Sequence, residues 1–145
     1  MNLPPLNPEP PPECVVVLEL PVPPSSNRYW RSLLLKGRSK KTKANPDGWA
    51  SVMVRSTEAR VYIQNTKVAF HQQIGYEFRP FIGRVAVTIT WRRERRAGDL
   101  DNRVKILLDA IKGLAYEDDG QIVEEHAYRI DGETPGMTVR IVELP

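Results

Sequence analysis

The feature that most constrains the fold is a strict alternation of residue types between Arg84 and Trp91. Every second position carries a large apolar side chain, and the positions between them carry Ala or Thr; the apolar set is Val85, Val87, Ile89 and Trp91. A period of two is typical of a half-buried β-strand. Because such a strand must cover its apolar face, the chain has to supply a second layer of structure.

Two segments have the spacing expected for that second layer. The first begins at Ser56 and Thr57, which are good helix N-caps, and carries apolar residues at helical spacing to about Gly75. The second begins near Asp99 to Asp101 and ends at Gly113. Its apolar stripe is formed by Val104, Leu107, Leu108, Ile111 and Leu114. Both patterns predict amphipathic helices.

Further β-branched or apolar runs predict strands at Cys14–Leu20, Trp49–Arg55, Gln121–Ile130 and Met137–Leu144. The polar and aromatic segment from Ser25 to Arg31 is expected to be a loop. The order of elements predicts a mixed α/β (α+β) fold, in which two main helices lie on a small mixed sheet. We expect residues 14–145 to form one domain of this kind.

The N-terminal segment has a different composition. Nine of the 13 prolines fall within the first 24 residues, and residues 1–13 are expected to be an extended or disordered tail. With Cys14 as the only cysteine, no internal disulfide is possible. The sequence shows no 18-residue apolar run and no basic region followed by an apolar core, so we expect neither a membrane span nor a secretory signal, and a cytoplasmic protein.

Acidic residues gather around the second predicted helix. On a helix that starts near Asp101, the side chains of Asp101, Lys105 and Asp109 lie at i, i+4 and i+8, on one face. Asp99 lies in the preceding turn, and three further acids follow the helix at Glu117, Asp118 and Asp119. Neighbouring carboxylates repel each other unless a cation lies between them. Oxygen ligands of this kind suit Mg²⁺, and a carboxylate-bound Mg²⁺ beside a lysine is suited to phosphodiester cleavage.

Two simpler interpretations of the same residues remain open at this point. An Asp-x-Asp pair at a helix start is often only an N-cap that favours the helix dipole. Asp101 and Lys105 can equally form a surface ion pair, worth about 0.3 to 0.5 kcal/mol.

The acidic segment resembles the signature of the RusA family of Holliday junction resolvases. The resemblance rests on Asp99-Leu100-Asp101-Asn102, Lys105, Asp109-Ala110 and Asp118-Asp119-Gly120-Gln121-Ile122. The first loop of that family is similar to Pro23-Pro24-Ser25-Ser26-Asn27-Arg28-Tyr29-Trp30-Arg31. Two separate motifs in the right order together cover the chain from about Cys14 to Leu144. The proline-rich tail and the long basic segment from about Ser32 to Ser51 depart from the short family pattern.

The resemblance implies roles for individual residues. Asp99, Asp101 and Asp119 match the metal ligands of the family, and Lys105 matches its catalytic lysine; Asp109 and Asp118 are assigned supporting roles. It also implies a homodimer that resolves four-way DNA junctions with paired, Mg²⁺-dependent nicks, in recombination and repair. We expect Mg²⁺ as the cofactor, with Mn²⁺ as an alternative ion. A two-fold axis fits this activity, because symmetric resolution needs two cuts.

Positive charge marks the expected DNA contacts. The stretch from Arg28 to Lys43 contains seven Lys or Arg residues and no acid, and a second basic run leads into Asp99. The residues that we expect to contact DNA are Asn27, Arg28, Tyr29, Arg31, Lys36, Arg38, Lys40, Lys41, Lys43, Arg93, Arg95 and Arg96. Tyr29 and Trp30 can stack on unpaired bases or belong to the core, and the sequence favours neither.

Two other functions are compatible with the same residues. One is a non-catalytic module that binds branched DNA on this scaffold. The other is a Mg²⁺-dependent nuclease for flaps, replication forks or RNA.

Overall fold

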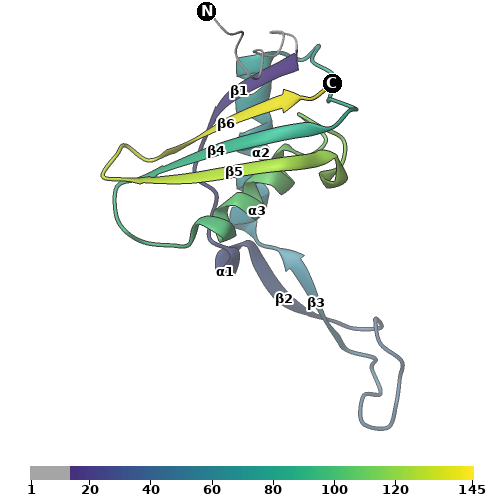
Figure 1. The fold of residues 1–145 in the computed structure, drawn as a ribbon. Helices are drawn as coiled ribbons and strands as arrows, with labels where there is room; N and C mark the ends of the chain where they lie inside the picture. Colours follow the sequence, from purple (N-terminus) through teal and green to yellow (C-terminus); the bar gives the residue numbers. More distant parts are fainter. Residues whose placement is uncertain (1–13) are drawn as a thin grey trace, which may run out of the picture.

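The computed structural model describes residues 14–145 and confirms the mixed α+β fold (Figure 1). The elements are β1 (Val15–Leu20), α1 (Ser26–Tyr29), β2 (Trp30–Leu35), β3 (Ala50–Arg55), α2 (Thr57–Ile74), β4 (Val85–Arg93), α3 (Leu100–Ile111), the 3-10 turn η2 (Asp119–Gln121), β5 (Ile122–Asp131) and β6 (Gly136–Glu143). The proline-rich tail expected for residues 1–13 lies outside the described residues. Within residues 14–145, no helix is long and apolar enough to cross a membrane.

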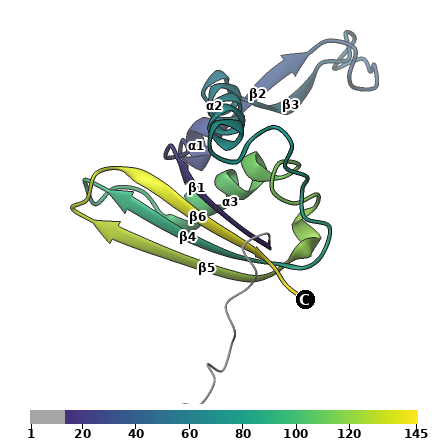
Figure 2. The ribbon, with the colours of Figure 1, turned by 90° about the horizontal axis from the view of Figure 1, so that it is seen from above.

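Four strands form a mixed sheet in the order β1-β6-β4-β5. β6 pairs antiparallel with both β1 and β4, whereas β4 and β5 are parallel. Parallel neighbours need a crossover connection, and here α3 provides it. Figure 2 shows α2 and α3 on the same side of this sheet. The chain therefore leaves β4, runs through α3 and returns along β5, which places α3 beside the β5 edge.

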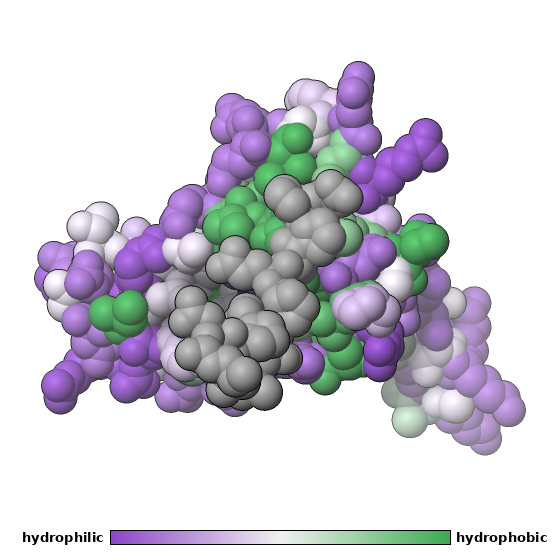
Figure 3. Space-filling model, turned by 45° about the horizontal axis from the view of Figure 1, so that its top comes forward, coloured by the Kyte–Doolittle hydropathy of each residue, from purple (hydrophilic) through white to green (hydrophobic). Residues whose placement is uncertain are grey.

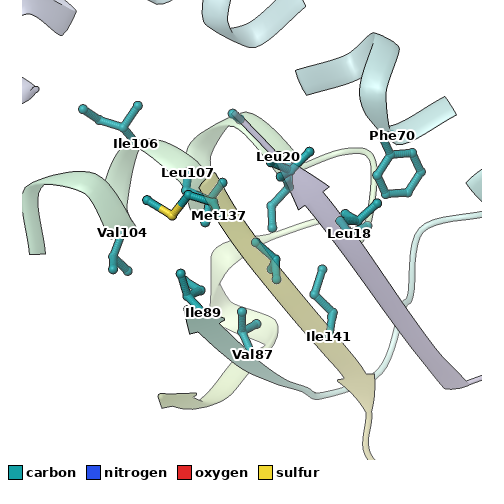
Figure 4. Packing of buried hydrophobic residues seen from close by; sticks show 14 of the residues in the cluster. Leu18, Leu20, Phe70, Val87, Ile89, Val104, Ile106, Leu107, Met137 and Ile141 are labelled. Atoms are coloured by element: carbon teal, nitrogen blue, oxygen red, sulfur yellow. The ribbon is translucent and has the colours of Figure 1, made fainter. Parts of the chain in front are cut away.

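The core lies between the sheet and the helices. The predicted alternation in β4 is observed, because Val85, Val87 and Ile89 are fully buried and the residues between them are partly exposed. α3 turns its apolar stripe toward them, with Leu107 and Ile111 also fully buried. Figure 4 shows α3 side chains gathered against side chains of the sheet. This packing fixes the rotation of α3 about its own axis, and so decides which of its residues face outward.

The segment before α2 differs from the prediction. The expected loop from Ser25 to Arg31 forms the short helix α1 and the first residues of β2, a strand that the sequence did not indicate. β2 pairs antiparallel with β3, from Trp30 opposite Arg55 to Leu35 opposite Ala50. Most residues of β2 are exposed, so it lacks the alternation that reveals a half-buried strand.

β2, β3 and the connecting residues 36–49 form a two-stranded arm, named the ribbon below. The ribbon pairs with none of the four strands of the main sheet. In Figure 1 it extends away from the sheet and the helices, with residues 36–49 at its far end. The long basic segment from about Ser32 to Ser51, which departs from the short family pattern, therefore forms a separate projection.

Leu107→Ala should lower the free energy of unfolding by about 2 to 5 kcal/mol, because it removes a fully buried side chain and leaves a cavity between α3 and the sheet. Leu34→Ala is the matched control, since Leu34 lies on the ribbon and is 68% exposed. Urea unfolding of both variants measures the difference. Equal losses in the two variants would contradict the placement of α3 in the core.

Candidate active site

A cleft of about 980 Å³ lies between α3 and β5. Its walls contain five of the residues singled out in the sequence, which are Asp99, Asp101, Lys105, Asp109 and Asp119. Apolar side chains, among them Val104 and Leu108, form part of the lining. One cleft thus collects residues from the loop before α3, from α3 itself and from the turn before β5.

The face of α3 that lines the cleft is the predicted one. Asp101, Lys105 and Asp109 follow one another at i, i+4 and i+8 and all line the cleft. Their common orientation follows from packing, because the opposite face of α3 is buried on the sheet. The apolar stripe and the acidic face are consequences of the same helical period.

Both aspartates lie where they favour the helix dipole, with Asp99 at the N-cap and Asp101 in the first turn, but neither simpler interpretation engages their carboxylates. Asp99 occupies the N-cap position of α3 with extended backbone, but its side chain makes no capping hydrogen bond within residues 14–145. Across the same residues, Asp101 and Lys105 form no ion pair with each other. The carboxylates of Asp99 and Asp101 therefore remain available to a ligand in the cleft.

The position of Asp99 is set by the residue before it. Gly98 has a φ of +90°, which a residue with a side chain rarely adopts. A Cβ atom there would also lie 3.3 Å from Nη2 of Arg103 and 3.4 Å from the indole of Trp91. The guanidinium groups of Arg93 and Arg103 both lie over that indole, 5.3 and 5.4 Å from its centroid. The loop into α3 is thus pressed against a packed aromatic and cationic cluster.

Arg93, one of the residues expected to contact DNA, belongs to this cluster and is engaged within the protein. Its side chain is only 8% exposed, and its Nε lies 2.5 Å from Oδ1 of Asp131. Its Nη1 donates a hydrogen bond to the carbonyl oxygen of Gly98 at 3.0 Å. Arg93 therefore fixes the loop that carries Asp99, whereas Arg95 and Arg96 in the same basic run are exposed.

Asp119 is held at the other end of the cleft. It lies in η2, where Asp118 and Gln121 form a reciprocal capping box. The Nε2 of Gln121 also donates to the carbonyl oxygens of Phe81 and Gly83. Lys112 reaches the turn from the end of α3, with its Nζ 3.0 Å from Asp118 and 3.3 Å from Asp119. The hydrogen bond from Lys112 lowers the pKa of Asp118.

These positions separate the three expected metal ligands along the cleft. Asp99 and Asp101 lie at the start of α3, whereas Asp119 lies beyond its end. A helix of 12 residues is about 18 Å long at the usual rise per residue. In agreement, no group of three His, Cys, Asp or Glu side chains within residues 14–145 is close enough to hold a metal ion. One chain alone does not bring Asp119 to the other two aspartates.

The structure adds two residues to the cleft that the sequence did not reveal. Glu125 and Arg129 lie on β5 and line the cleft opposite α3. They are paired in register with Val87 and Trp91 of β4, which face the helices. β5 is an edge strand with most residues exposed, so it shows no periodicity that would have marked these side chains as inward-facing.

A smaller cavity of about 430 Å³ adjoins the other side of the acidic face, against α1 and the base of the ribbon. Tyr29 and Trp30 both border it, together with Asp101, Lys105 and Asp109. Tyr29 is 1% exposed and belongs to the core, which is one of the two alternatives that the sequence left open for it. Trp30 is 44% exposed and is the aromatic residue that a ligand at this site can reach.

Comparison with protein-family models gives a match to endodeoxyribonuclease RusA over residues 20–142. The chain belongs to the RusA family. The matched region contains every cleft residue and the whole ribbon, so the RusA family assignment covers the candidate active site and makes the protein an endodeoxyribonuclease. A comparison with curated proteins gave no match.

In this RusA-family nuclease, Asp131→Asn should lower the melting temperature at pH 7, because Arg93 loses its charged partner. The hydrogen bond from Arg93 holds the pKa of Asp131 below its usual value. A depressed pKa stabilises the folded state above the unfolded pKa, and this contribution is lost as the pH falls through the folded pKa. The difference in melting temperature between wild type and variant should therefore be full at pH 7 and shrink below about pH 4.

Thermal unfolding followed by circular dichroism between pH 7 and pH 3 measures this difference. Glu133→Gln is the control, since Glu133 is an exposed acid in the adjacent turn. A difference that does not change with pH would rule out the ion pair as its source.

Proposed function

We propose that the protein resolves four-way DNA junctions by Mg²⁺-dependent hydrolysis of phosphodiester bonds, with paired nicks in strands of like polarity. The observation that carries the proposal is the acidic face of α3 in a cleft of a RusA-family nuclease, where Asp101 and Asp109 flank Lys105. Membership of the RusA family supports the nuclease activity and the junction substrate, and the chemistry of the cleft supports the metal.

The donor set fits Mg²⁺ or Mn²⁺. The cleft offers carboxylates from Asp99, Asp101 and Asp119, with Asp109 and Glu125 beside them, and its cations are only Lys105 and Arg129. Hard oxygen donors of this kind are what Mg²⁺ prefers, and Mn²⁺ accepts the same ligands. We assign Asp99, Asp101 and Asp119 as the metal ligands. A metal bound there supplies a water of lowered pKa and neutralises charge on the scissile phosphate.

The remaining groups of the cleft act on the phosphate directly or hold the ligands in place. Lys105 lies between Asp101 and Asp109 on the exposed face of α3, where its ammonium group can stabilise charge that develops on the phosphoryl or leaving oxygen. Asp109, one helical turn beyond Lys105 on the same face, is assigned a supporting role in the cleft. Asp118 acts through Lys112, which fixes the turn that carries Asp119.

DNA contacts near the cleft come from exposed residues on both sides of it. Asn27, Arg28 and Arg31 lie on α1 and the base of the ribbon, and Arg95 and Arg96 lie in the loop before Asp99. Their positive charges suit phosphate groups. Trp30 borders the smaller cavity beside Asp101, and its exposed ring is placed to stack on an unpaired base at the branch point.

We further propose that the metal site is completed in a homodimer. Within one chain the acids lie at opposite ends of the cleft, so a two-fold axis across its middle would bring Asp119 of each copy to Asp99 and Asp101 of the other. The open edge of β5 offers such an axis, because among residues 14–145 β5 pairs only with β4.

An antiparallel pairing of two β5 edges centred on Ala127 is chemically self-complementary. Glu125 of each copy then lies opposite Arg129 of the other, on the face that lines the cleft. The exposed apolar residues of β5, which are Val123, Tyr128 and Ile130, come close to the partner in the same pairing. Two clefts on one continuous sheet would serve the two cuts.

The first experiment is cleavage of a synthetic mobile four-way junction in Mg²⁺ and in EDTA, with linear duplex and flap substrates beside it. We expect paired, symmetric nicks that require the metal and are absent from duplex. Tight junction binding without nicks would instead indicate a binding module, and equal cutting of flaps would indicate a general nuclease for branched DNA.

Asp101→Asn should reduce the rate of cleavage at least about a hundredfold while junction binding is retained, because one proposed metal ligand loses its charge and the DNA contacts remain. Glu77→Gln is the control, since Glu77 is exposed and lies outside the cleft. Single-turnover cleavage and gel-shift binding measure the two effects. Normal cleavage by Asp101→Asn in Mg²⁺ would refute its role as a ligand.

The shared site predicts complementation between two inactive variants. Dimers that combine one Asp101→Asn chain with one Asp119→Asn chain contain one intact site, so they should nick one strand, whereas each variant alone should nick neither. Differently tagged chains are co-expressed, the mixed dimer is purified, and its nicks are mapped. An inactive mixed dimer would place all three aspartates of a site in one chain.

A further inference from the structure

We propose that the ribbon is a second DNA-binding element, which holds a duplex arm of the branched substrate at a distance from the scissile phosphate. The proposal rests on the proposed function, since it assumes a branched DNA in the cleft. It assigns the ribbon a part in substrate selection and none in the chemistry.

Charge is concentrated at the far end of the ribbon. Residues 36–49 carry five Lys or Arg residues and a single acid, Asp47, whereas the net charge of the whole chain is only +3. Lys36 is paired with Asp47 at 3.1 Å. Within residues 14–145 the other four cations have no carboxylate at ion-pair distance, and these are Arg38, Lys40, Lys41 and Lys43. Uncompensated charge of this density favours a polyanion.

The far end of the ribbon is a structured loop. The side chain of Asn45 makes two hydrogen bonds to the backbone of Trp49, one donated to its carbonyl oxygen and one accepted from its N–H. The backbone N–H of Ser39 donates to the carbonyl oxygen of Gly48 at 2.9 Å. Gly48 has a φ of +66°, and a Cβ atom there would lie 2.5 Å from the carbonyl oxygen of Ser39. This close approach requires glycine, so the four cations are presented by a defined backbone.

The shaft of the ribbon separates this charge from the cleft. Residues 32–35 and 50–54 contain no charged side chain. The base of the shaft is Trp30, which borders the cavity next to Asp101. In Figure 1 the ribbon extends away from α3, and in Figure 3 its far end at the lower right is mostly hydrophilic. DNA that passes the cleft and Trp30 therefore meets positive charge again only at the end of the ribbon.

Trp49 adds a second feature typical of nucleic-acid contacts. Its ring is 46% exposed and lies at the end of the loop that Asn45 closes. Exposed aromatic rings among lysines and arginines are typical of surfaces that bind nucleic acid. Charge, exposed aromatic surface and a fixed backbone together point to nucleic acid as the partner of this surface, and away from the branch point a branched DNA offers a duplex arm.

Two variants test the proposal in the full-length protein. In the first, residues 36–49 are replaced by Asn-Gly, since Leu35 and Ala50 are paired across the ribbon and a two-residue turn can join them. In the second, Arg38, Lys40, Lys41 and Lys43 are all changed to Gln. The control changes four other exposed cations to Gln, which are Lys67, Arg79, Arg84 and Arg140.

Each protein is tested on junctions with short arms and with long arms. Both ribbon variants should bind long-armed junctions at least tenfold more weakly than wild type and short-armed junctions equally well, with the same cleavage rate at saturating enzyme. Loss of four phosphate contacts should reduce the slope of log K against log salt by about 3.6 per ribbon. The control variant should show a smaller change that does not depend on arm length.

Other outcomes would overturn the proposal. An unchanged affinity for long arms would exclude the ribbon as a DNA contact, and an equal loss on both substrates would make it part of the cleft. If removal of the ribbon halves the molecular mass in solution, its partner is a second copy of the chain. Failure of the proposed function would give a different result. Wild type would then cut neither junction, whereas the salt dependence of binding would still report DNA contacts made by the ribbon.

Discussion

The packing of α3 on β4 is the constraint on which the remainder of the structure depends. Fully buried side chains of α3, such as Leu107 and Ile111, meet the buried face of β4, so α3 cannot rotate without exposing them. That fixed rotation places Asp101, Lys105 and Asp109 in the cleft. The parallel pairing of β4 and β5 has the same origin, because α3 is the crossover between them. The apolar residues of α3 thus determine where its polar residues lie.

A second constraint acts on the loop between β4 and α3. The five residues 94–98 would not by themselves hold Asp99 in place. Arg93, however, donates a hydrogen bond to the carbonyl oxygen of Gly98 and is in turn paired with Asp131 at the end of β5. The basic run therefore contains two kinds of arginine. Arg93 is buried and structural, whereas Arg95 and Arg96 are exposed, Arg96 at the outer side of the same Asp131 carboxylate. The sequence of residues 92–96 gives no indication of which arginine is buried and which are exposed.

What the sequence could reveal follows from which interactions are local. The alternation in β4 and the helical stripe of α3 are periodic, so both elements and the common face of Asp101, Lys105 and Asp109 were predictable from spacing. β2 and the cleft residues Glu125 and Arg129 were not, because both strands are largely exposed and their inward faces depend on pairing between distant segments. The burial of Tyr29 next to an exposed Trp30 was equally invisible, since adjacent aromatic residues look alike until one of them enters the core.

The separation of the acids along α3 is the most informative departure from the sequence argument. The resemblance to the RusA family groups Asp119 with Asp99 and Asp101, but the helix between them is rigid and keeps the two groups apart by roughly its own length. A helix cannot shorten to bring the three aspartates together. Either the third metal ligand comes from a second copy of the chain, or Asp119 does not bind the same metal ion as Asp99 and Asp101. The two-fold axis that we propose across the β5 edge would resolve this, because it would exchange the two ends of the cleft. In that proposal the symmetry that provides two cuts also makes each metal site dependent on assembly, so a lone chain would hold an incomplete site and would leave DNA uncut.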